Sequence, residues 1–146
     1  MESATNRAIL RAVSEESVEI VRGIYDRWSA GDLGDWAAFH PGVEYARIGA
    51  AGTGLTGEFS GLEEVVGALI EWLQSWADVR ARAERIEDIG NGRVMVFSHQ
   101  TGRGRASGTP LDLRTADIWT LRDGKVVRWE SYWDRAQALE AAGVSQ

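Results

Sequence analysis

The chain has 146 residues, a net charge of −6 and 44% apolar residues, a balance that fits one globular domain with a sizeable core. It has no cysteine, which excludes disulfides and Cys-ligated zinc and suits a cytoplasmic location, and its two His residues exclude a His-rich metal site. The negative charge without a basic run argues against nucleic acid as a partner, and no apolar stretch is long enough for a membrane span.

The first half of the chain is predicted to be mainly helical. Residues 1–13 lack a clear cap and are expected to form an arm, either loose or as a short helix, before a single domain over residues 14–146. A first helix is expected over residues 14–31, where a Ser cap precedes apolar residues at helical spacing. A second, short helix is expected over residues 32–41, and a capping box begins a third over residues 60–76.

The second half alternates apolar and polar residues, which is typical of half-buried strands. Tight turns at Asn91-Gly92 and Asp123-Gly124 are expected to join antiparallel neighbours. The loop over residues 49–57 contains four Gly but lacks the spacing of phosphate-binding loops. Asp134 can cap a last helix over residues 135–142. Strands are expected over residues 43–48, 79–89, 93–101, 111–121 and 125–133, with a short return strand around Phe59 and a bulge before Ile86.

Helices early and antiparallel strands late predict an α+β fold and not a parallel βαβ fold. A curved antiparallel sheet with a mixed edge would pack against the three helices of the N-terminal half, with the short C-terminal helix added. Such a sheet can close into a cone whose mouth is a pocket. The seven Trp residues exceed what a core of this size needs, so some are expected to line that pocket.

Three strings of the sequence are typical of a known family. They are Ile24-Tyr25-x-x-Trp28-x-x-Gly31-Asp32, Ser60-Gly61-Leu62-Glu63, and residues 117–127 followed by Tyr132-Trp133-Asp134. Through them the chain resembles the nuclear transport factor two-like (NTF2-like) superfamily, in particular its SnoaL-like polyketide-cyclase and ketosteroid-isomerase-like branches, over about residues 14–143. The resemblance implies the cone fold and a homodimer formed through the outer face of the sheet. It does not fix an activity, because the superfamily holds isomerases, cyclases, hydrolases, dehydratases and binding domains.

Ketosteroid isomerase uses an Asp base, with a Tyr and a protonated Asp as oxyanion donors. The resemblance places Asp117 where that family has the protonated Asp. The family's Tyr position falls on Ile24, so Tyr25 is offset by one residue, which is about 100° around a helix. The position of the base falls on Arg47. The resemblance therefore implies part of the oxyanion-binding half of such a site, without the base.

Three residues are predicted to be catalytic. Asp117 would lie on the apolar inner face of its strand, where burial raises a carboxyl pKa and favours an acid/base or oxyanion-donor role. The alternative is a carboxylate satisfied by a Tyr, a Trp or an Arg. Tyr25 is a possible co-donor, or else a core aromatic. His99 is a possible second acid/base opposite Asp117, or else a satisfied core His.

Eight residues are predicted to bind substrate. Arg47 could hold an anionic or enolate oxygen, or else pair with Glu44 or Glu58. The aromatic residues could line a cavity for a flat, apolar ligand, although each could be plain core. Trp76 and Trp133 are expected to pack between subunits. The eight are Trp28, Trp36, Arg47, Phe59, Trp72, Phe97, Trp119 and Trp129.

These patterns together predict a small-molecule pocket protein. The hypothesised chemistry is proton transfer on a small hydrophobic carbonyl compound, as in isomerisation, cyclisation or dehydration, with no cofactor and no metal. Two alternatives stay open. One is a non-catalytic module that binds an apolar ligand in the same pocket, and the other is a structural dimerisation domain.

Overall fold

The protein is described by a computed structural model that covers residues 4–49 and 56–143. Its six strands form one open sheet in the order β2-β1-β6-β5-β4-β3, in which only the β1–β6 pair is parallel. The predicted α+β class and mixed sheet are confirmed. The helices are α1 (Ala4–Ser29), α2 (Leu62–Ser75) and α3 (Arg135–Ala142). The strands are β1 (Phe39–Ile48), β2 (Thr56–Ser60), β3 (Trp76–Gly90), β4 (Arg93–Gly104), β5 (Pro110–Arg122) and β6 (Lys125–Tyr132).

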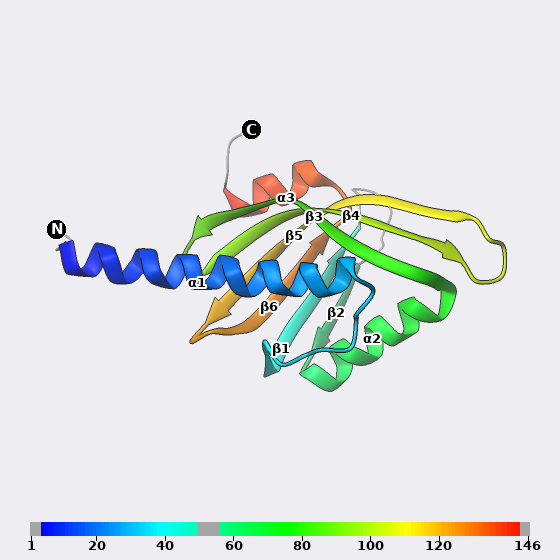
Figure 1. The fold of residues 1–146 in the computed structure, drawn as a ribbon, viewed down its shortest axis with the longest axis horizontal. Coiled ribbons are helices and arrows are strands. Elements are labelled where there is room, and N and C mark those ends of the chain that lie inside the picture. The colour runs from blue at the N-terminus through cyan, green and yellow to red at the C-terminus, as the bar shows by residue number, and fades with distance from the viewer. Residues whose placement is uncertain (1–3, 50–55, 144–146) are drawn as a thin grey trace.

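The helices lie on both faces of the curved sheet. Helix α1 crosses the inner face and packs on β3 and β4, while α2 packs on β1, β2 and β3 (Figure 1). Helix α3 packs on β5 and β6 from the outer face. Among the described residues, none of the helices is long and apolar enough to cross a membrane.

Helix α1 is longer than predicted. It begins at Ala4, so the expected cap at Ser14 lies inside it and residues 4–13 are helical. The sequence between Ala4 and Arg22 contains no Gly or Pro to interrupt a helix. The first half of α1 projects beyond the sheet (Figure 1), and its apolar side chains there are exposed. The second half buries Ser17 and four hydrophobic residues: Val21, Ile24, Tyr25 and Trp28.

The predicted short helix over residues 32–41 is wrong. This segment is a loop that enters β1 at Phe39. The Asp32 carboxylate accepts from the backbone N–H of Gly34 at 3.3 Å, and Asp35 accepts from Ala37 at 3.0 Å. Such local side-chain bonds satisfy the backbone without a helix.

The predicted capping box at residues 60–63 is also wrong, although the helix predicted to follow it is present. Ser60 is the last residue of β2, and the N-cap of α2 is Gly61, with no side-chain cap. Gly61 has a φ of 88°, which favours glycine, and its N–H donates to the Val43 carbonyl at 2.8 Å. The turn from β2 into α2 is therefore made by the backbone conformation of Gly61 and not by a side-chain cap.

The two tight turns and the β3 bulge are confirmed. Asn91-Gly92 and Asp123-Gly124 both have positive φ at the two central positions, as a type I′ hairpin requires. The pairing of β3 with β4 shifts between Ala83 and Arg85, just before Ile86. A second shift, between Thr120 and Leu121, was not predicted.

Helix α3 forms over the predicted residues 135–142, and it covers part of the outer face. The Asp134 carboxylate caps it by accepting from the Ala136 N–H at 2.8 Å, and Gly143 ends it with a φ of 72°. Ala138 of α3 lies fully buried against a second core cluster on the outer face, which includes Met95 and Ile118. Both faces of the central strands are therefore buried.

We predict that Gly92→Ala destabilises the fold more than Gly90→Ala. A Cβ at Gly92 would lie 2.7 Å from the Leu121 carbonyl oxygen, whereas nothing lies within 4 Å of one at Gly90. Both glycines have positive φ, so both variants carry the backbone cost of about 1–2 kcal/mol. Overpacking adds about 1–3 kcal/mol at Gly92 alone. Urea unfolding measures the difference, and equal destabilisation would contradict the clash.

Candidate functional site

Four aromatic side chains form a continuous row across the inner face, which we call the aromatic row: Phe59, Tyr45, Trp129 and Trp119. The strand registers place them opposite one another in that order. Successive ring centroids are 5.8, 4.1 and 4.8 Å apart, and all three pairs are stacked. Trp28 of α1 packs on this row, 5.3 Å from Trp129. Stacked cross-strand pairs of this kind stabilise the sheet. Because Tyr45 and Trp129 each have a neighbouring ring on both faces, the row turns ring edges towards the space beside it.

A second row, the polar row, lies two residues further along the same strands. It consists of Arg47 on β1, Ser131 on β6 and Asp117 on β5, which are register partners in that order. Because side chains alternate along a strand, the polar row faces the same side as the aromatic row. The inner-face position of Asp117 agrees with the predicted alternation.

Asp117 is almost fully buried, with 2% of its surface exposed, and is held by donors from several elements. The Tyr25 hydroxyl donates to Oδ2 at 2.5 Å and the Ser98 hydroxyl to the same oxygen at 3.2 Å. The Trp129 indole N–H donates to Oδ1 at 3.4 Å. Trp119 in turn donates to the Tyr25 oxygen at 3.1 Å. The structure thus brings together Asp117 and Tyr25, two of the predicted catalytic residues.

Burial sets the protonation of this pair. Loss of water around the carboxyl raises the pKa of Asp117, and the neighbouring donors, Tyr25 first and then Ser131, oppose this rise without cancelling it. Burial also raises the pKa of Tyr25, and the adjacent Asp117 raises it further. Tyr25 therefore stays a hydroxyl donor, and Asp117 is biased towards its neutral acid.

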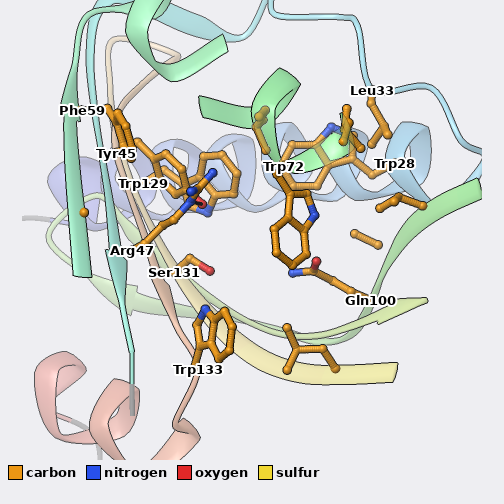
Figure 2. A pocket seen from close by; sticks show the side chains of 16 residues that line it. Trp28, Leu33, Tyr45, Arg47, Phe59, Trp72, Gln100, Trp129, Ser131 and Trp133 are labelled. Carbon is orange, nitrogen blue, oxygen red and sulfur yellow. Dashed lines mark hydrogen bonds between the residues drawn. The ribbon is translucent and has the colours of Figure 1, made fainter. Parts of the chain in front are cut away.

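A cavity of about 410 Å³ lies between the inner sheet face and helices α1 and α2 (Figure 2). Its aromatic wall residues are Trp28, Tyr45, Phe59, Trp72, Trp129 and Trp133. Its aliphatic wall residues are Leu33, Leu69, Leu73, Val79, Ala81 and Leu113. The remaining wall residues are Gly57 and three with polar side chains, Arg47, Gln100 and Ser131. Asp117 and Tyr25 are not wall residues, but Asp117 adjoins two of them, Trp129 and Ser131.

Five of the eight predicted substrate-binding residues line this cavity, namely Trp28, Arg47, Phe59, Trp72 and Trp129. The other three do not. Trp36 packs edge-on against Phe39 at 5.0 Å, and Trp119, the last member of the aromatic row, is fully buried. Phe97 lies on the outer face, where Arg135 stacks 5.0 Å from its ring.

His99 does not reach the site, so its predicted place opposite Asp117 is wrong. On β4 the inner face carries Val94, Val96 and Ser98, and His99 points the opposite way. Its Nε2 lies 2.6 Å from the Asp112 carboxylate, which is exposed. The hydrogen bond with His99 lowers the pKa of Asp112. Within residues 4–49 and 56–143, no three His, Asp or Glu side chains are gathered to hold a metal ion.

Four wall residues that carry polar atoms were not predicted to bind substrate: Tyr45, Gln100, Ser131 and Trp133. Tyr45 could have been found, because the alternation that places Arg47 inward also places Tyr45 inward. Trp133 lines the cavity with 38% of its surface exposed, and its expected packing between subunits stays a prediction. The place of Ser131 depends on the unpredicted shift between β5 and β6.

The chain matches one known protein family, and its fold is similar to those of several solved structures. A family model described as a SnoaL-like domain matches residues 21–129. No curated protein matches the chain.

Three solved structures illustrate the shared fold. A putative SnoaL-like polyketide cyclase from Jannaschia sp. CCS1 has 18% identity and a TM-score of 0.67, covering 90% of this chain and 94% of that one. TerC, co-crystallised with polyporic acid, has 24% identity and a TM-score of 0.66, covering 88% and 98%. An LEH-like epoxide hydrolase from M. tuberculosis has 14% identity and a TM-score of 0.63, covering 88% and 90%. At these identities the likeness shows the fold alone.

We predict that Asp117→Asn changes how stability depends on pH. The folded pKa of Asp117 is raised above its unfolded value of about 3.9. As pH rises from about 4, the unfolded chain ionises first, so the wild type loses up to about 1.4 kcal/mol per pH unit until the folded pKa is passed. The variant lacks this loss. The difference between its free energy of unfolding and that of the wild type should therefore rise as pH increases.

Urea unfolding of both proteins between about pH 4 and about pH 8 measures this difference. Asp112→Asn is the control with the opposite sign, because the pKa of Asp112 is lowered in the folded state. Its difference from the wild type should fall only up to about pH 5, where the unfolded chain has ionised, and stay constant above that pH. A flat or falling difference for Asp117→Asn would contradict the raised pKa.

Proposed function

We propose that this chain, which belongs to the SnoaL-like family, binds a small, flat and mostly apolar molecule in the cavity between the sheet and helices α1 and α2. The observation that carries this proposal is the cavity itself, at about 410 Å³ with a mainly aromatic and aliphatic wall. Small-molecule sites commonly have volumes of about 300–1,000 Å³, apolar walls and a few placed polar groups.

The aromatic row supports a flat ligand in particular. Trp129 and Tyr45 are stacked with an angle of 18° between their planes, and both border the cavity. Their arrangement is fixed by strand pairing, so it exists before a ligand arrives. A planar ring can meet these fixed ring edges in an edge-to-face contact with little loss of side-chain freedom. The similar fold of TerC, which was co-crystallised with polyporic acid, is consistent with this use of the cavity.

Filling the cavity should abolish ligand binding. Leu69 of α2 lines the cavity, whereas the next residue, Ile70, is 53% exposed on the other side of the helix. We predict that Leu69→Trp weakens binding of the neutral fluorescent probe N-phenyl-1-naphthylamine by at least about tenfold, because the indole occupies the ligand's volume. Ile70→Trp makes the same change outside the cavity and should bind like the wild type. Equal binding by all three proteins would contradict the assignment.

A second function, proton transfer on a small hydrophobic carbonyl compound, is favoured by the polar row. Asp117 is the register partner of Ser131, and Ser131 lines the cavity. A carbonyl group placed against Ser131 would be one side chain away from a carboxyl whose pKa is raised. Asp117 would act as acid and base, with Tyr25 steadying its charge, and no cofactor is required.

Hydrogen–deuterium exchange tests this second function. We predict that the protein accelerates exchange of the α-protons of 2-tetralone in D2O, followed by NMR. Asp117→Asn should lower the rate to that of the buffer, because the amide cannot take up the proton. The variant should bind N-phenyl-1-naphthylamine as the wild type does. If the wild type gives no acceleration, the binding function stands without this chemistry.

Dimer formation through the outer sheet face remains a prediction that rests on the family resemblance, and the cytoplasmic location rests on the absence of cysteine. Helix α3 already covers part of that face, at Met95, Ala116 and Ile118. A dimer contact would therefore use the uncovered part, where His99 is the register partner of Arg114. Such a contact would be largely polar.

A further inference from the structure

We propose that the cavity selects a flat ligand carrying an anionic oxygen, such as a carboxylate, phenolate or enolate, and that Arg47 binds this oxygen beside Tyr45 and Ser131. The inference rests on the proposed binding function and names the chemical class of its ligand. It follows from three features of the cavity wall: a fixed guanidinium, the absence of a carboxylate to neutralise it, and two hydroxyl groups next to it.

The guanidinium of Arg47 is held in place by the protein. Its Nε donates to the Tyr45 hydroxyl at 3.1 Å, and its Nη2 donates to the Ala68 carbonyl of α2 at 2.9 Å. The rings of Tyr45 and Phe59 lie 5.4 and 5.3 Å from its central carbon. Arginine carries five N–H donors, and two of them are used by these described residues. A cation oriented in this way can meet an anion without first losing side-chain freedom.

The charge of Arg47 has no carboxylate partner among the described residues. The cavity wall contains no Asp or Glu. Glu44, one of the partners that the sequence suggested, lies 3.8 Å from Arg128 instead. Asp117 lies beyond Ser131 in the polar row, and its hydrogen bonds come from Tyr25 and other buried donors. A half-buried cation in an apolar wall favours an anion as its ligand and opposes a cationic one.

Two hydroxyl groups complete this corner of the cavity. The Tyr45 oxygen accepts from Arg47, and its own O–H finds no acceptor in the part of the chain that the structure describes. Ser131 is the register partner of Arg47 and also lines the cavity. Figure 2 shows Arg47 and Ser131 on one side of the pocket and Gln100 on the other. An oxyanion at this corner would leave the ligand's ring beside Trp129.

The test compares two ligands of the same shape, 1-naphthoate and 1-naphthamide, by calorimetry at neutral pH. The carboxylate should bind the wild type at least about tenfold more tightly than the amide, since hydrogen bonds to charged groups are the stronger ones. Arg47→Gln should reduce this preference to less than about twofold. Arg80→Gln removes the same charge from a residue that donates to the Ser29 carbonyl outside this cavity, and should keep the preference.

The outcomes separate this inference from the function on which it rests. If N-phenyl-1-naphthylamine binds but the wild type does not prefer the carboxylate, the inference is overturned and the binding function stands. A preference that survives in Arg47→Gln also overturns it. If none of the three probes binds, both fail. The wild type's preference between the two ligands is measured without any variant. The inference can therefore be overturned even if Arg47→Gln does not fold.

Discussion

Burial of the Asp117 carboxyl is the constraint on which the inner half of the structure depends. A polar group removed from water costs several kcal/mol unless hydrogen bonds replace its hydration. Asp117 obtains these bonds from α1, β4 and β6, through Tyr25, Ser98 and Trp129. The Tyr25 bond forms only where α1 lies across the sheet, so it ties the helix to the strands. The cavity is the part of the inner face that α1 leaves open.

Strand pairing turns this constraint into a site. The β1–β6 and β5–β6 registers align the aromatic row, which offers a fixed wall of ring edges, beside the polar row, which offers a cation, a hydroxyl and a buried acid. The cation, Arg47, and the hydroxyl, Ser131, belong to the cavity wall, whereas the acid, Asp117, does not. In our proposal, Arg47 and Ser131 recognise the ligand, and Asp117 acts on it only through its neighbours.

The sequence could predict the elements and part of the site, because alternation and turn residues are local signals. Asp117 faces inward as its alternation with Trp119 indicates. The partner of Asp117 was not predictable in this way: counting from the Asp123-Gly124 turn gives Glu130, and the shift after Thr120 moves Ser131 there. His99 was misplaced because both faces of β4 are apolar. Since α3 buries Met95 on the outer face, alternation alone cannot say which face is inner.

We propose that a flat ligand lies in the cavity beside the aromatic row and is oriented by Arg47. A crystal structure of the protein with 1-naphthoate tests this claim most directly. We expect the naphthalene ring between α2 and Trp129, with its carboxylate within hydrogen-bond distance of the Arg47 guanidinium and the Tyr45 or Ser131 hydroxyl. Naphthoate bound elsewhere, or bound in the cavity with its carboxylate turned away from Arg47, would contradict the account.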